Sequence, residues 1–205
     1  MPHTATHPRK TPRQARSRAT VSVILEAAAL LLVEDGFDQV TTNQIAERAG
    51  VSIGSLYQYF PNREALIVAV AQRTEAQLSE VIRQTVVEAI VEAPPSDLRS
   101  LLSSGLHATV SAHAGVLPLS RILLAVTPRR VDALSKWPPV LHDLFSKYST
   151  ELRSNFDIGV GSILIPSLVD SAIDTAILSH PATLANGELE RELNTMLSYY
   201  LIGDR

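Results

Sequence analysis

The sequence predicts an all-α protein with about nine helices. Apolar residues recur at spacings of three and four along most of the chain, as they do on one face of a helix. No segment alternates apolar and polar residues over the length of a strand, so a sheet is not expected. The 205 residues, of which 45% are apolar, suffice for one large or two small hydrophobic cores.

The chain opens with a basic arm. Residues 1–16 have no apolar periodicity, which predicts a flexible segment. Residues 1–20 carry five bases and no acid, although the whole chain has a net charge of −3. The first helix follows and ends at Gly36. Its apolar face consists of Val21, Ile24, Leu25, Ala28, Leu31 and Leu32.

Two short helices are expected next. Thr41 and Gln44 have the spacing of a capping box, in which each side chain satisfies a backbone N–H at a helix start. Gly50 is free to adopt the positive φ that ends this helix. Ser52 is placed to cap the following helix, which ends before Pro61 because the residue before a proline is pushed out of the α region.

A long connecting helix is expected over residues 62–92, because its apolar pattern continues without a breaker as far as Pro94. The remaining sequence predicts helices near residues 96–113, 117–126, 128–136, 139–157, 163–180 and 187–202. Pro166 either begins the helix that contains it or kinks it.

The two short helices, residues 42–48 and 52–59, have the dimensions of a helix-turn-helix. Ile45 and Leu56 face inward, toward the apolar face of the first helix. The residues left exposed on the second helix carry no charge that would repel a phosphate backbone, so this helix can enter a major groove. They are Ser52, Ile53, Gly54, Ser55, Tyr57, Gln58 and Tyr59.

A set of residues at fixed spacing carries a resemblance to a known family. The set comprises Gly36-Phe37, Thr41-Thr42, Ile45-Ala46, Ala49-Gly50-Val51-Ser52, Gly54, Tyr57, Tyr59-Phe60 and Arg63-Glu64-Ala65-Leu66. With these residues, the segment 24–67 resembles the DNA-binding domain of the TetR family of bacterial transcriptional regulators. The resemblance implies a DNA-binding domain over residues 17–61 and an effector-binding and dimerisation domain over residues 62–205.

The resemblance also implies how the site meets a double-stranded DNA operator. The residues that would hold phosphates are Thr41, Thr42, Ser52, Tyr57, Tyr59 and Arg63. Gly54 would allow close approach, and Ile53, Ser55 and Gln58 would read bases. Gln58 can pair with adenine, and Ile53 can meet a thymine methyl group. For Tyr59, a role in the core alone is the alternative.

The basic arm lies directly before the first helix, which favours DNA contacts by Arg16 and Arg18. The alternative is a solvated tail without a partner.

The segment between Arg99 and Arg121 has no charged residue. It is long enough to cross a bilayer but too polar, so we expect a buried segment of a soluble protein and no membrane partner. Its hydroxyls and His107 then need partners, which either a small-molecule effector or neighbouring backbone supplies. Residues predicted to line an effector site are His107, Val110, Leu123, Trp137, Leu141, Phe145 and Tyr148.

Apolar stripes on the last two helices indicate half of a four-helix bundle that a second copy completes. The predicted homodimer interface consists of Val169, Ile173, Ile177, Leu193, Met196, Leu197 and Tyr200. The alternative is that both stripes face their own chain.

The sequence does not favour an enzyme. It contains no catalytic motif, no cofactor fingerprint and no set of residues with metal-ligand spacing. The chain has no cysteine, which fits a cytoplasmic protein. We therefore expect a ligand-responsive transcriptional repressor that a small molecule releases from a palindromic operator. The alternatives are an activator of the same fold and a helical dimeric interaction module without a ligand.

Overall fold

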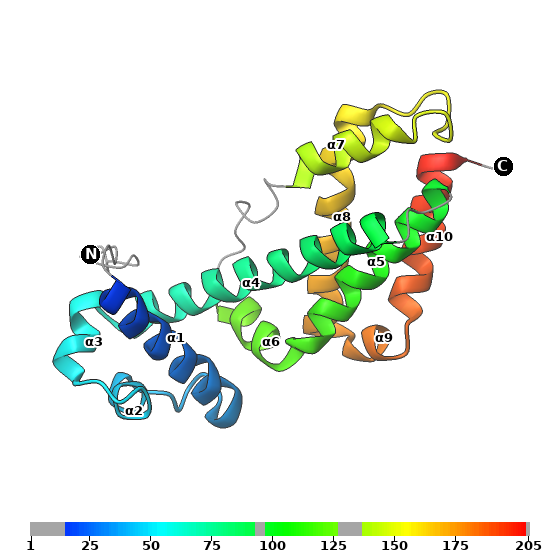
Figure 1. Cartoon of the computed structure of the whole chain (residues 1–205). Coiled ribbons are helices and arrows are strands. Elements are labelled where there is room, and N and C mark those ends of the chain that lie inside the picture. Colours follow the sequence, from blue (N-terminus) through cyan, green and yellow to red (C-terminus); the bar gives the residue numbers. More distant parts are fainter. Residues whose placement is uncertain (1–14, 93–96, 127–136, 204–205) are drawn as a thin grey trace, which may run out of the picture. The chain divides into compact units, whose positions relative to one another are not determined.

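The computed structural model describes residues 15–92, 97–126 and 137–203, and these residues form helices and no strand (Figure 1). The prediction of an all-α fold is confirmed. The ten helices are α1 (Ala15–Asp35), α2 (Thr42–Arg48), α3 (Ile53–Tyr59), α4 (Arg63–Glu92), α5 (Leu98–Gly115), α6 (Leu117–Val126), α7 (Trp137–Lys147), α8 (Ile158–Ser179), α9 (Pro181–Ala185) and α10 (Glu188–Ile202).

The chain divides into two compact units, and α4 contributes to both. The first unit comprises residues 1–75 and 118–128, and the second comprises residues 76–117 and 129–205. The first unit thus includes the start of α4 and nearly all of α6, in addition to the three helices expected from the sequence.

The core of the first unit forms where α1, α2, α3 and the start of α4 meet (Figure 1). Its most deeply buried side chains are Ile24, Leu32, Val40, Ile45, Leu56, Phe60 and Leu66. Leu123 of α6 also belongs to this core. Burial of a large apolar side chain contributes about 1.5–3 kcal/mol, so this cluster holds the short helices α2 and α3 in place.

In the second unit, α8 packs against α7, α9 and α10, and α5 packs against α10. Pro166 lies inside α8, so it does not begin that helix. α8 has the length and composition of a membrane-spanning helix, but core helices of soluble proteins share both properties, and 39% of its apolar window is buried.

Several helix bounds differ from the sequence prediction, most of all those around residues 147–158. The helix expected over residues 139–157 ends at Lys147. The connection that follows is held by the Arg153 N–H, which donates to the Leu201 carbonyl of α10 at 2.8 Å. Asp157 then caps α8 by accepting from the Val160 N–H at 2.9 Å, so α8 begins at Ile158. The short helix α9 lies between the helices predicted over residues 163–180 and 187–202. The helix expected over residues 128–136 lies outside the described residues.

Candidate nucleic-acid interface

α2 begins at the predicted capping box, which the structure confirms. The Thr41 hydroxyl accepts from the Gln44 N–H at 3.3 Å, and the Thr41 N–H donates to the Gln44 side-chain oxygen at 2.8 Å. Both interactions are local, and together they satisfy two backbone donors that a helix start would leave unpaired.

The turn between α2 and α3 depends on Gly50, whose φ of +66° lies in the left-handed region. The Gly50 N–H donates to the Glu47 carbonyl, and the Val51 N–H donates to the Ala46 carbonyl, each at 3.0 Å. Ser52 then caps α3 by accepting from the Ser55 N–H at 3.1 Å. These bonds fix where α3 starts relative to α2.

α3 is anchored by Leu56, which is fully buried, and it presents its other side to solvent. At 100° per residue, Gly54 and Gln58 lie opposite Leu56, and both are exposed. Ile53 and Tyr57 both lie to one side of this line, with 38% and 42% of their surfaces exposed. None of these side chains is charged. The described structure therefore presents an uncharged face of the kind that can enter a major groove.

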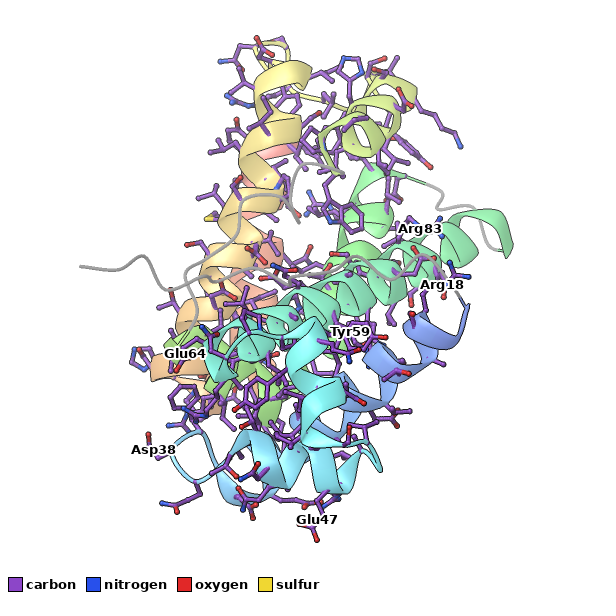
Figure 2. The ribbon with its side chains drawn as sticks, turned by 90° about the vertical axis from the view of Figure 1, so that its left-hand side faces the viewer. Arg18, Asp38, Glu47, Tyr59, Glu64 and Arg83 are labelled. Carbon is purple, nitrogen blue, oxygen red and sulfur yellow. The ribbon has the colours of Figure 1, made fainter. Side chains whose placement is uncertain are left out.

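Two other residues of α3 that are predicted to contact DNA are half-buried and have contacts within the chain. Ser55 is half-buried, and its hydroxyl lies 2.8 Å from that of Ser52. Tyr59, labelled in Figure 2, is half-buried and packs against the core of the first unit. Tyr59 therefore has a packing role, whereas its phosphate contact stays a prediction.

One side-chain contact joins the two short helices directly. The Thr42 hydroxyl on α2 lies 3.1 Å from the Tyr57 hydroxyl on α3, within hydrogen-bond distance. Thr42 and Tyr57 are both predicted to hold phosphates, so this bond orients the two groups relative to each other before DNA arrives.

Three arginines of the first unit are occupied by contacts within the chain. Arg48 forms two hydrogen bonds with the Glu34 carboxylate, at 2.6 and 2.8 Å. These bonds lower the pKa of Glu34 and raise that of Arg48. Arg63 stacks on the Phe37 ring, 4.2 Å from its centroid, and donates to the Phe37 carbonyl. Arg73 donates to the Ser22 carbonyl on α1 at 2.8 Å.

Arg63 thereby ties the start of α4 to the connection between α1 and α2. This packing role was not anticipated from the sequence, and its phosphate contact stays a prediction. Figure 2 shows Asp38 in that connection and Glu47 on α2, both exposed. Arg18 of α1 is exposed, whereas the Arg16 side chain and residues 1–14 lie outside the described part of the chain.

The predicted effector residues belong to both units. Leu123 lies in the core of the first unit, whereas the others lie in the second. Of these, Val110, Phe145 and Tyr148 are buried, and Trp137 and Leu141 are half-buried. Phe145 packs edge-on against Phe156, which in turn packs edge-on against Tyr200.

The expectation that His107 is buried is wrong. Its side chain is 69% exposed, and its Nδ1 lies 3.1 Å from the Glu190 carboxylate on α10. His113, six residues further along α5, is the buried histidine of this helix. Its Nδ1 donates to the Thr109 carbonyl at 2.8 Å. Burial lowers the pKa of His113, and that hydrogen bond and the charge of Asp170 only partly offset the effect.

The predicted dimer residues also need correction. Five of them lie in the interior of their own chain, because α8 and α10 pack together there: Val169, Ile173, Ile177, Leu193 and Leu197. Tyr200 is half-buried in the aromatic cluster, and Met196 is exposed. The apolar side chains that α8 leaves exposed are instead Val160, Ile163, Leu164, Leu168 and Leu178. The apolar stripes that periodicity indicated on α8 and α10 therefore face the interior of their own chain.

A short exposed helix, held at a fixed angle by a glycine turn and a capped partner helix, defines a helix-turn-helix DNA-binding protein. Residues 24–70 match the family described as bacterial regulatory proteins, tetR family. The nucleoid occlusion factor SlmA of Actinobacillus pleuropneumoniae is 36% identical over 73 residues, which cover 36% of this chain and 36% of SlmA. The chain thus matches little more than a third of the length of that relative.

Two solved structures resemble the fold over most of its length. A TetR-family transcriptional regulator from Pectobacterium atrosepticum has a TM-score of 0.73 at 19% identity, and the match covers 95% of this chain and 100% of that one. SmeT, the repressor of the Stenotrophomonas maltophilia multidrug efflux pump SmeDEF, has a TM-score of 0.64 at 18% identity, with 92% and 93% covered. Residues 24–70 thus carry the match to the tetR family of regulatory proteins, and the two structures show that the chain has the fold of such regulators.

Proposed function

We propose that the chain is a ligand-responsive repressor that works in the cytoplasm as a homodimer on a palindromic operator. The observation that carries the proposal is the exposed, uncharged face of α3, which is held by Gly50 and by the two helix caps. A solved structure with the same fold is described as a repressor, which supports repression over activation.

The test begins with duplexes selected from a random-sequence pool by the full-length protein. Binding of a selected duplex is then measured for Tyr57→Ala and Gln58→Ala, with Gln77→Ala, an exposed residue of α4, as the matched control. We expect both α3 variants to bind more weakly and the control to bind like the wild type. Unchanged affinity in both α3 variants would refute the site, and transcription in vitro from a template carrying the duplex distinguishes repression from activation.

The proposed homodimer uses the exposed apolar face of α8. At 100° per residue, Val160, Ile163, Leu164, Leu168 and Leu178 fall on one side of this helix. Exposed apolar clusters of this kind mark interaction sites. A second copy of the chain is the proposed occupant of this face. A two-fold dimer places a second helix-turn-helix one helical turn of DNA away, and contacts to both halves of a palindromic operator increase specificity.

Sedimentation analysis of Ile163→Glu tests the dimer. Ile163 is 61% exposed, so the substitution should not disturb the fold, but a carboxylate on the apolar face should shift the protein toward the monomer. Gln77→Glu adds the same charge elsewhere and should leave the mass unchanged. A dimeric Ile163→Glu protein would rule out this face.

The proposed effector is a small, largely apolar molecule that binds within the second unit. Three buried side chains support this choice of unit, namely Phe145, Tyr148 and His113. Burial lowers the pKa of His113, which favours its neutral form. A thermal-shift screen of apolar metabolites should yield compounds that raise the melting temperature and also weaken operator binding, because the two affinities are reciprocally coupled. Compounds that stabilise the protein without affecting DNA binding would argue against an effector role.

A further inference from the structure

The base-reading face of α3 has a restricted chemistry. Gln58 is the only long polar side chain on the outermost line of the helix, and Gly54, one turn before it, leaves room for that line to approach DNA. A Cβ atom on Gly54 would meet nothing nearer than the Ser52 hydroxyl oxygen at 3.9 Å. Ile53, an exposed neighbour at the start of α3, is apolar.

Arginine and lysine are the usual partners of guanine, because they donate to both its O6 and N7 atoms. α3 contains neither residue. The arginines of the adjoining elements are held elsewhere: Arg48 by Glu34, Arg63 by Phe37 and Arg73 by Ser22. Recruiting Arg48 or Arg63 would break a bidentate ion pair or a stacked contact.

A glutamine amide matches adenine instead, since it donates to N7 and accepts from N6. An apolar side chain matches the methyl group of thymine. We therefore propose that α3 selects A·T base pairs, with Gln58 on adenine and Ile53 on a thymine methyl group, and that no guanidinium reads guanine at these positions. This inference rests on the proposed function and names the class of operator that the site takes.

The first experiment compares selections from one random-sequence duplex pool by full-length wild type and by Gln58→Ala. The positions whose preference disappears in the variant are those that Gln58 reads, and we expect A·T pairs there. Gln58→Lys is the complementary test, because a lysine at this position should change the base preference there from adenine to guanine. Gln58 is exposed, so both variants should keep the wild-type melting temperature.

The second experiment changes single atoms of the DNA. In the selected duplex, 7-deazaadenine removes N7 and 2′-deoxyuridine removes the thymine methyl group. The first should weaken wild-type binding by about 5- to 150-fold, and it should have no further effect on Gln58→Ala. The second should cost about fourfold in affinity and should have no further effect on Ile53→Ala.

The outcomes separate this inference from the proposed function. If the selected half-sites carry G·C at the Gln58 positions, or if 7-deazaadenine weakens wild type and Gln58→Ala equally, the assignment of A·T reading is overturned while the regulator remains a DNA-binding protein. If the wild type selects no sequence at all, the proposed function fails first.

Discussion

Replacing Gly161 with alanine adds a methyl group where the second unit has no room for it. An ideal Cβ atom at this position would lie 2.1, 2.8 and 3.0 Å from three atoms of the Phe156 ring. Distances this short require the ring to move. Phe156 is held edge-on between Phe145 and Tyr200, with ring centroids 5.7 and 5.5 Å away, so movement of the ring disturbs both aromatic contacts.

The expected cost follows from three terms. Overpacking a tight site costs about 1–3 kcal/mol. Disturbing an aromatic pair costs a further ~0.5–1.5 kcal/mol. Removing a glycine from a helix returns about 1 kcal/mol. The free energy of unfolding of Gly161→Ala should therefore fall by about 0.5–3.5 kcal/mol.

Urea unfolding followed by the fluorescence of Trp137 measures this change in the relevant unit, because it is the only tryptophan of the chain and lies on α7. Gly105→Ala provides a matched control within α5. No atom lies within 4 Å of its added Cβ, so this variant should gain about 0.5–1 kcal/mol. If Gly161→Ala were as stable as Gly105→Ala, the close packing of Phe156 on α8 would be refuted.

Three further predictions concern the first unit, the buried histidine and the arm. In thermal unfolding, Gly50→Ala should destabilise the first unit by about 1–2 kcal/mol, because the φ of Gly50 is +66°. Gly54→Ala should stabilise α3 in the same assay, but it should weaken duplex binding in a titration. Burial lowers the pKa of His113 below its ordinary 6.5, so below pH 6.5 the unfolded chain binds a proton that the folded chain excludes. The wild type should lose stability there on acidification, and His113→Gln should lack this part of the loss. Deletion of residues 1–14 removes three bases and should reduce the slope of log affinity against log salt by up to about 2.7, and an unchanged slope would show that the arm is a solvated tail.

The helix-turn-helix could be predicted from the sequence because local signals encode it. The Thr41 capping box, the positive φ at Gly50 and the Ser52 cap each involve residues within a few positions of one another. Patterns of this range are visible in a sequence without knowledge of the tertiary fold. The bond between Thr42 and Tyr57 crosses 15 residues, and no sequence pattern indicated it.

The faces of α8 could not be predicted, because this helix is apolar on more than one side. Ile173 and Ile177 are buried, but Ile163 and Leu168 are exposed, so periodicity alone gives two stripes and no means of choosing between them. The prediction that His107 is buried was wrong for a related reason. Its partner, Glu190, lies 83 residues away, and only the packing of α5 against α10 brings them together.

The bond between Thr42 and Tyr57 has a consequence for regulation. This bond and the shared core join α2 and α3 to each other, so we expect them to keep their relative orientation when DNA binds. In the proposed dimer, an effector bound to the second unit would then change the spacing of the two helix-turn-helix pairs but not the base preference of either pair. We expect such a ligand to lower the affinity for strong and weak operators by the same factor and to leave their ranking unchanged.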